Sequence, residues 1–269
     1  MNPLSSKQTR FWSACMLLTV CWLGLAQPAT AQQPRLNDHN TIGWLANFTT
    51  LRVAERWSIH LEHQIRRDEL VAAKQQSLSR MGVNYIVNDK LTLRAGYAWI
   101  ETYPYGDHPI QGSGREFPEN RTYQMATLSN PVGRVGITHR FMLEQRWVGS
   151  YSQSELPTPD RVSYLNRARY MLRVQVPIGK PTMGDKTAYL AAYDEVFIGF
   201  GKNVGANVFD QNRLGLMAGY RFSPVFRVEG GYLQQIVQLG RLVDNRNVFQ
   251  YNNGVIINTY IDLNLRKKK

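Results

Sequence analysis

The chain has 269 residues, with 32 basic and 20 acidic side chains and a formal net charge of +12. A basic balance of this kind is typical of nucleic-acid-binding proteins, but the N-terminal residues predict export, and an exported chain does not meet nucleic acid in its normal function. Cys15 and Cys21 both lie in that N-terminal segment, so disulfides are excluded from the mature protein, and no later segment has the length and apolarity of a transmembrane helix.

The N-terminal segment has the three parts of a secretory signal peptide. Lys7 and Arg10 form its positive region, residues 11–26 are almost continuously apolar, and residues 29–31 (ATA) fit the small-x-small cleavage pattern. The apolar stretch is shorter than the roughly 20 residues of a spanning helix, which argues against an uncleaved anchor. We expect cleavage to remove residues 1–31, which contain no acid, and to leave 30 basic and 20 acidic residues with a net formal charge of +10.

The mature chain begins with a short polar lead over residues 32–40 and then alternates apolar and polar residues with a period of two. Ile42, Trp44, Ala46 and Phe48, for example, share one face of the first predicted strand. The strands predicted from this alternation are 41–49, 56–66, 78–87, 91–100, 121–129, 133–148, 166–178, 187–200, 211–222, 225–238 and a last strand that ends at residue 265.

The pattern is clearest in GRVGITHRFMLEQRW, residues 133–147. Its apolar face includes Val135, Ile137, Phe141 and Leu143, and arginines recur on the other face. A soluble antiparallel strand can alternate in this way, but here the alternation recurs nearly to the last residue. A closed membrane barrel explains the recurrence better, because lipid faces one side of each strand and a polar lumen faces the other.

Three long loops are predicted over residues 102–120, 149–165 and 201–210, and short turns alternate with them. Short turns at one end and long loops at the other are typical of outer-membrane barrels. We therefore predict an all-β fold, a transmembrane antiparallel up-and-down β-barrel over residues 41–265. Single-chain bacterial barrels usually have an even number of strands, so we expect about 12, with 10 as the alternative. A basic tail, residues 266–269, follows.

Parity along the strands predicts which side chains face the lumen. Asp194 and Glu195 are consecutive, so only one of them can do so. The predicted charged cluster of the lumen consists of Arg140, Glu144, Arg146, Arg167, Arg169, Arg173, Asp194, Glu195, Arg213, Arg227 and Glu229, with Arg221 on the same face as Arg213. Such a cluster could form a plug of guanidinium–carboxylate pairs or a constriction that selects anions. We favour the plug, because a small barrel leaves little free cross-section.

Aromatic residues where strands meet long loops predict an interfacial girdle, made of Trp99, Trp147 and Tyr170. Several segments together resemble a bacterial family catalogued as domain of unknown function 2490, namely HRFMLEQRW (139–147), ARYMLRVQVPI (168–178), YDEVF (193–197), FDQNRLGLMAGYRF (209–222) and EGGYLQQ (229–235). The resemblance implies a signal peptide followed by an outer-membrane β-barrel, and it implies no particular activity. Many such barrels end on an aromatic residue that the insertion machinery recognises, whereas this chain ends on basic residues.

We expect an integral outer-membrane barrel of a gram-negative bacterium, with a structural or passive transport role and without cofactor or metal. Its expected partners are membrane lipid, lipopolysaccharide and the barrel-insertion machinery. The sequence does not identify a transported solute or a surface ligand. The alternative is a surface-binding barrel whose loops use the aromatic side chains Tyr103, Tyr105, Phe117 and Tyr151. A lipid-modifying enzyme is less favoured, because no serine stands out near His139, the best-placed histidine. His60 and His63 face opposite sides of a strand, so they form no zinc-protease pattern.

Overall fold

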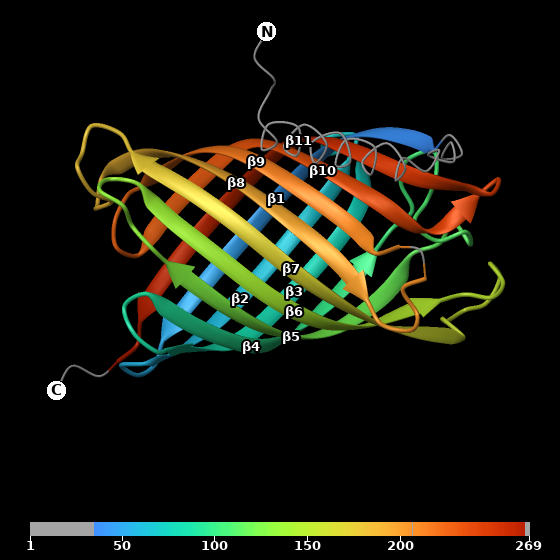
Figure 1. Cartoon of the computed structure of the whole chain (residues 1–269), viewed down its shortest axis with the longest axis horizontal. Helices are drawn as coiled ribbons and strands as arrows, with labels where there is room; N and C mark the ends of the chain where they lie inside the picture. The colour runs from blue at the N-terminus through green and yellow to red at the C-terminus, as the bar shows by residue number, and fades with distance from the viewer. Residues whose placement is uncertain (1–34, 206, 267–269) are drawn as a thin grey trace, which may run out of the picture. The chain divides into compact units, whose positions relative to one another are not determined.

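The computed structural model describes residues 35–205 and 207–266 (Figure 1). The predicted signal peptide, residues 1–31, lies outside the described residues, as does the basic tail beyond residue 266. No helix in the described part of the chain is long and apolar enough to cross a membrane.

In the described residues, eleven β-strands close into one barrel, and every neighbouring pair except the one at the seam is antiparallel. The strands are β1 (Leu36–Arg52), β2 (Trp57–Asp68), β3 (Ala73–Ile86), β4 (Leu91–Thr102), β5 (Phe117–Ser129), β6 (Gly136–Ser150), β7 (Arg161–Pro177), β8 (Thr187–Phe200), β9 (Phe209–Arg221), β10 (Phe226–Val243) and β11 (Arg246–Asn264). Their order around the barrel follows their order in the chain, so the predicted up-and-down β-barrel is confirmed.

The number of strands falls between the two numbers that the sequence suggested. Consecutive strands of an up-and-down sheet alternate in direction, so an odd number leaves the first and the last strand pointing the same way. The seam is accordingly parallel, with Leu36 opposite Val248 and Arg52 opposite Asn264. β1 begins at Leu36 rather than at residue 41, so most of the predicted polar lead is part of the first strand.

The three loops predicted to be long lie at the same end of the barrel, which we call the long-loop end. They span residues 103–116, 151–160 and 201–208. The opposite end, the short-turn end, carries the connections 53–56, 87–90, 130–135, 178–186 and 222–225. Because β1 and β11 are parallel, β1 begins at the long-loop end and β11 finishes at the short-turn end.

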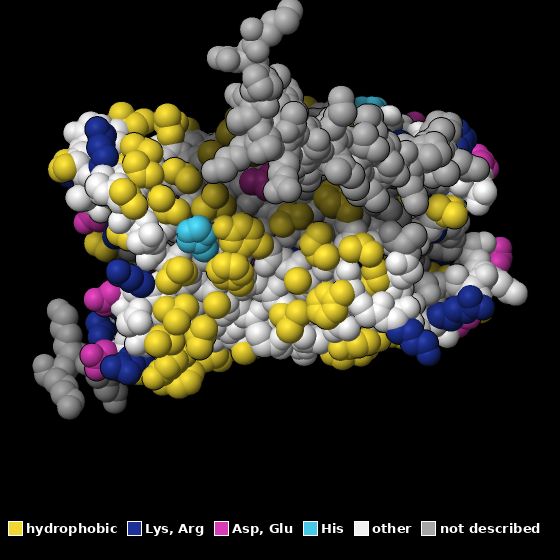
Figure 2. All heavy atoms as spheres, viewed as in Figure 1, with side chains coloured by type: hydrophobic (Ala, Val, Ile, Leu, Met, Phe, Trp, Pro, Cys, Tyr) yellow, Lys and Arg dark blue, Asp and Glu magenta, His cyan; other side chains and the backbone are white. Residues whose placement is uncertain are grey.

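Most large apolar side chains on the strands point outward and are exposed. Examples are Met81, Val83, Leu93, Phe141, Leu143, Leu172, Leu190, Leu216, Val255 and Ile257. On the face seen in Figure 2, hydrophobic side chains cover the middle of the barrel, and charged side chains gather towards its two ends. The charged residues between the exposed apolar ones point into the lumen and are buried. This distribution is the reverse of that in a soluble protein.

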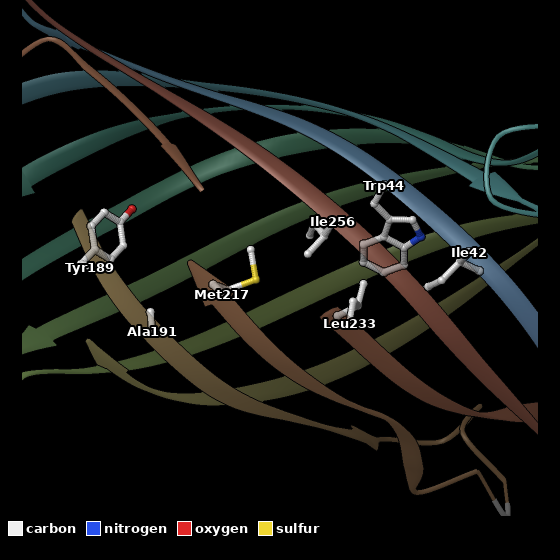
Figure 3. Close-up of a cluster of buried hydrophobic side chains, with 7 residues drawn as sticks. All are labelled: Ile42, Trp44, Tyr189, Ala191, Met217, Leu233 and Ile256. Atoms are coloured by element: carbon white, nitrogen blue, oxygen red, sulfur yellow. The ribbon is translucent and has the colours of Figure 1, made fainter. Parts of the chain in front are cut away.

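β1 departs from this rule, because Ile42, Trp44 and Ala46 face inward and are buried, and only Leu45 among its large apolar side chains is strongly exposed. Ile42 and Trp44 lie in a buried group, which we call the Trp44 cluster (Figure 3). Its other members are Tyr189, Ala191, Met217, Leu233 and Ile256. The ring of Tyr189 lies over Gly219, where an added Cβ atom would be 2.3 Å from the ring, so the absence of a side chain there makes room for the tyrosine.

Candidate functional site

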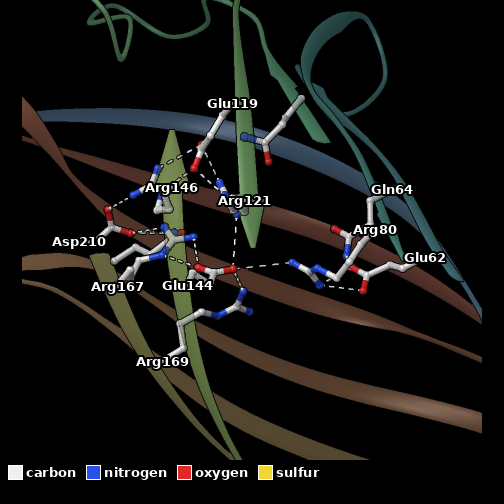
Figure 4. Close-up of polar contacts among 12 residues, drawn as sticks. Glu62, Gln64, Arg80, Glu119, Arg121, Glu144, Arg146, Arg167, Arg169 and Asp210 are labelled. Atoms are coloured by element: carbon white, nitrogen blue, oxygen red, sulfur yellow. Dashed lines mark hydrogen bonds and ion pairs between the residues drawn. The ribbon is translucent and has the colours of Figure 1, made fainter. Parts of the chain in front are cut away.

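Inward side chains from four strands converge on one carboxylate at the centre of the lumen. Glu144 on β6 is 1% exposed, and its oxygens lie 2.6 Å from Arg167 and 2.9 Å from Arg169, both on β7 (Figure 4). Arg121 on β5 and Arg80 on β3 approach the same carboxylate at 3.7 and 3.9 Å. We call these five residues the Glu144 network. Four positive groups around one negative group link the inner surfaces of β5, β6 and β7, which are neighbours, to that of β3.

The ion pairs continue beside this network on two further carboxylates. Glu119 accepts hydrogen bonds from Arg121 and Arg146, each at 2.5 Å from Nε. Asp210 accepts from Arg167 at 2.6 Å and from Arg146 at 3.3 Å. Arg146 therefore links Glu119 on β5 to Asp210 on β9. Shared partners of this kind connect strands that are distant in the chain.

Three other carboxylates extend the same chemistry along the lumen. Glu62 binds Arg80 at 2.7 Å, and Glu195 binds Arg140 and Arg169, each at 2.8 Å. Glu229 binds Arg173 at 2.6 Å and also accepts hydrogen bonds from the hydroxyls of Tyr189 and Tyr260 and from the amide of Asn258.

These charges depend on one another, because each has left water on entering the lumen. The effective cost of burying an ion is several kcal/mol, and attraction offsets it only when the geometry is good and the remaining hydrogen-bonding groups are satisfied. The multiple contacts of each carboxylate meet that condition. Once such pairs are assembled, removing one partner leaves an uncompensated buried charge, which costs about 3–5 kcal/mol.

The structure brings together nearly all the charged residues that the sequence assigned to the lumen. Arg140, Glu144, Arg146, Arg167, Arg169, Arg173, Glu195, Arg213, Arg227 and Glu229 all point inward or are buried against the lumen. Arg221 binds Asp185 and the carbonyl of Ser223 at the short-turn end. Asp194 is the correction. It lies exposed on the outer face, where it accepts hydrogen bonds from Asn212 at 3.1 Å, because its neighbour Glu195 takes the inward position.

Several lumen residues were missed by the sequence reasoning. Parity could have found Glu62, Arg66, Arg80 and Arg94, because the alternate positions of β2, β3 and β4 are apolar and face outward. Glu119 and Arg121 share the inward face of β5 with Tyr123 and Met125, so alternation gives a weaker signal there. Asp210 had no such signal, because the register between β8 and β9 shifts at Phe197 and Ile198. That irregularity lets both Asp210 and its neighbour Gln211 reach the lumen, which simple alternation forbids.

The predicted aromatic girdle needs one revision. Trp99 and Trp147 are 47% and 37% exposed on the outer face, and Trp147 packs against Tyr164 close to the long-loop end. Tyr170 lies instead near the middle of β7, packed against Phe141. The prediction placed it beside a loop because it started this strand at residue 166, whereas β7 begins at Arg161.

Loop 103–116 reaches over the lumen at the long-loop end and binds the opposite wall. Tyr105 is buried and donates its hydroxyl to Gln250 on β11 at 2.8 Å. The backbone N–H groups of Asp107 and His108 donate to Asp38 on β1, and Arg241 on β10 donates to the Pro109 carbonyl at 2.7 Å. Burial raises the pKa of Tyr105 to about 12, so the hydroxyl stays protonated and remains a donor at neutral pH.

The aromatic residues considered for partner binding are largely engaged within the protein. Phe117 is buried like Tyr105, and the ring of Tyr151 lies 4.6 Å from the guanidinium of Arg115. Lys74 lies 5.0 Å from the ring of Tyr103. The long-loop end therefore presents fewer free aromatic surfaces than the sequence suggested.

A cavity of about 960 Å³ remains between the walls of the lumen and under loop 103–116. His60 and Glu62 contact each other at 3.4 Å beside it, and His139 lies on the outer face with its Nδ1 atom 2.9 Å from the hydroxyl of Tyr170. No serine hydroxyl is within hydrogen-bonding distance of either histidine ring among the described residues. Nor does any group of His, Cys, Asp or Glu in the described ranges have the arrangement of a metal site. Guanidinium groups thus dominate the chemistry that the cavity offers.

The family described as "Protein of unknown function (DUF2490)" matches residues 41–245. The chain belongs to this family. The matched residues begin within β1 and run to the turn before β11, so they include the whole Glu144 network. No curated protein and no solved structure matches the chain. Membership in the family assigns no activity, and function has to be inferred from the lumen and the outer surface.

Proposed function

We propose that this protein is an integral outer-membrane β-barrel whose lumen is closed by ion pairs. Its role is structural, or it is passive transport through a tightly gated lumen. The observation that carries the proposal is the inverted distribution of side chains, with exposed apolar residues outside and buried charged residues inside. Lipid satisfies such an outer surface, and a closed sheet leaves no backbone group unpaired in it. In water, an apolar surface of this extent would promote association.

Aromatic pairs near both barrel ends support a membrane-spanning orientation. Trp147 and Tyr164 pack together near the long-loop end, and Trp57 and Tyr85 pack together near the short-turn end. Aromatic rings are enriched at both membrane–water interfaces, where their apolar bodies face lipid and their polar edges face water. We infer that the long-loop end faces the exterior and the short-turn end faces the periplasm, as is usual for such barrels.

Closure of the lumen is inferred from two features that act in series. The Glu144 network cross-links the walls near the middle of the barrel, and loop 103–116 covers the long-loop end. An anion crossing the Glu144 network would have to displace carboxylates from arginines that they already satisfy. We therefore favour a plugged barrel over a constitutively open, anion-selective channel.

One fractionation experiment tests the proposed location. The full-length precursor is expressed in a gram-negative host, membranes are separated on a density gradient, and unboiled samples are compared with boiled ones on a gel. We expect the mature protein in the outer-membrane fraction, with a folded form whose mobility changes on heating. A soluble periplasmic monomer that stays in solution without detergent would contradict the proposal.

The proposed partners follow from the proposed location in the outer membrane. We propose that membrane lipid and lipopolysaccharide surround the outer face and that the insertion machinery of the outer membrane assembles the barrel. Val255 and Ile257 on β11 present an apolar outer face for that process despite the basic residues that follow the strand. Neither a catalytic role nor a cofactor forms part of the proposal.

A further inference from the structure

Not all inward arginines take part in ion pairs. Arg66, Arg94, Arg213 and Arg227 contact no carboxylate among the described residues, and their partners are amide oxygens and aromatic rings. Arg94 lies against Asn84 and Arg227 over Tyr260, so each is isolated from the others. Arg66 and Arg213 differ from them, because both lie against the same indole ring.

That ring belongs to Trp44. The guanidinium carbon of Arg66 lies 3.9 Å from its centroid and that of Arg213 lies 5.0 Å from it. Trp44 is fixed in turn by a hydrogen bond from its indole N–H to Gln75 at 2.7 Å. Two like charges thus share one aromatic ring inside the lumen, without a carboxylate between them. A bound anion would offset this repulsion, because a guanidinium holds its positive charge strongly and presents several N–H donors.

The donors of these two arginines are only partly used. Arg66 is 6% exposed and donates to Gln64 at 2.7 Å and to Gln76 at 2.6 Å. Arg213 donates to Gln211 at 3.1 Å, and its buried Nε has no hydrogen-bond partner in the described structure. A guanidinium has five N–H donors, so most donors of Arg213 are free. Both side chains line the same cavity of about 960 Å³.

We propose that Arg66, Arg213 and Trp44 form a binding site for a small oxyanion, such as phosphate, inside the lumen. This assignment rests on the proposed closed barrel. It names the class of ligand that occupies the cavity left between the ion pairs. The oxyanion accepts hydrogen bonds from N–H groups of both arginines and offsets their positive charges. The ring of Trp44 fixes the distance between the two guanidinium groups. The hydrogen-bond acceptors of the two arginines are the neutral amides of Gln64, Gln76 and Gln211. The nearby carboxylates of Glu62, Glu195 and Asp210 are already paired with other arginines.

Trp44 also provides the readout. Residues 32–269 contain four tryptophans, and Trp57, Trp99 and Trp147 are exposed on the outer face whereas Trp44 is buried. A variant with these three outer residues changed to Phe therefore reports on the site alone. It is refolded in detergent, its folding is checked by heat-dependent gel mobility, and its emission is followed as sodium phosphate is added at constant ionic strength.

We expect a saturable change in Trp44 emission. In the same background, R66Q and R213Q should each weaken phosphate binding about tenfold or more, because hydrogen bonds to charged groups contribute that much. The matched control is R227Q, which removes the same charge from another lumen arginine without a carboxylate partner, and it should change the affinity less than about threefold, the effect expected of a distant charge in a screened cavity.

Two results would overturn the assignment. One is the absence of a saturable response in the folded Trp44 reporter, and the other is an equal loss of affinity in R227Q and R66Q, which would mean that phosphate responds only to the overall charge of the lumen. Fractionation tests the membrane location separately. A barrel that reaches the outer membrane but binds no phosphate refutes only the site, and one that binds phosphate but stays soluble refutes only the location.

Discussion

The Glu144 network and the Trp44 cluster fill the same lumen in opposite ways. Around Glu144, four arginines from three strands surround one carboxylate, and the walls are joined by directional ion pairs. Around Trp44, apolar side chains from β8 to β11 and β1 pack without ion pairs among themselves. Hydrogen-bonding geometry determines how the side chains of the Glu144 network are arranged, and side-chain volume determines how those of the Trp44 cluster pack.

The difference explains how a barrel can have a polar interior without being open. Charged side chains alone would draw water into the lumen, and apolar side chains alone would make the strands apolar on both faces and prone to aggregation. In the divided lumen, the ion pairs of the Glu144 network join the strands, and the apolar side chains of the Trp44 cluster fill space without charge. Arg66 and Arg213 lie against Trp44 at the border of its cluster, and Arg213 shares the ring of Phe197 with Arg167 and Arg169 of the Glu144 network. The two regions should therefore respond differently to substitution.

The largest effect is expected from E144Q. The change keeps the shape of the side chain but removes the negative charge that four arginines share, so about 3–5 kcal/mol of stability should be lost. Urea unfolding of the barrel in lipid vesicles, followed by tryptophan fluorescence, measures this loss. D244N is the control, because Asp244 and Arg246 form an exposed pair at 3.7 Å that should contribute less than about 1 kcal/mol. Equal losses in the two variants would contradict the central position of Glu144.

L233A tests the apolar region in the same assay. Leu233 is fully buried at 0% exposure, so truncation leaves a cavity and should cost about 3 kcal/mol. Unlike E144Q, it should leave the ion pairs intact and the lumen closed to ions. A loss below about 1 kcal/mol would show that the Trp44 cluster is loosely packed.

Y105F tests the loop that covers the lumen, with a smaller expected effect. Loss of the hydroxyl removes its hydrogen bonds to Gln250 and Asn252, which should cost about 1 kcal/mol. The pKa of Tyr105 is raised to about 12 in the folded protein, above the value of about 10 in an unfolded chain. Its contribution is therefore present below pH 10 and is lost as the pH rises to about 12.

The sign of this pH effect follows from the protonated hydroxyl, which the folded state favours. Between about pH 10 and pH 12 the unmodified protein should lose stability more steeply than Y105F. Unfolding midpoints measured across that range for both proteins make the comparison. Parallel pH profiles would mean that the hydroxyl of Tyr105 does not hold the loop in place.

The smallest effect is expected from D194N. Asp194 and Glu195 are consecutive, but the first is exposed outside with Asn212 and the second is buried between Arg140 and Arg169. D194N should therefore change stability by less than about 1 kcal/mol, while E195Q should cost about 3–5 kcal/mol. The pair differs by one position and by one face of the strand. A reversal of these effects in urea unfolding would reverse the assignment of the two faces.

Much of the barrel could be predicted because its strands obey a local rule. Alternation alone gave β8 its observed bounds, Thr187–Phe200, and put Arg167, Arg169 and Arg173 on one inward face. Alternation does not say which face is inside, and β1 shows this limit. Its apolar face, with Ile42 and Trp44, turned out to line the lumen rather than the outer surface.

The ion-pair partners could not be predicted, because they are set by closure and not by local pattern. Arg80 and Glu144 are far apart in the chain, and the register of the intervening strands decides whether they meet. The bulge that turns Asp210 inward and the parallel seam of an eleven-stranded barrel are likewise properties of the assembled sheet. The sequence offers residue types and faces, and the closed sheet selects the contacts.

The most direct test of the closed lumen is single-channel recording of the refolded protein in a planar bilayer, after heat-dependent gel mobility has confirmed folding. We expect the folded wild-type barrel to be electrically silent, because the Glu144 network and loop 103–116 block the path in series. Steady anion-selective conductance of the wild type, reduced by neutralising Arg140 and Arg173, would contradict this account and establish an open channel.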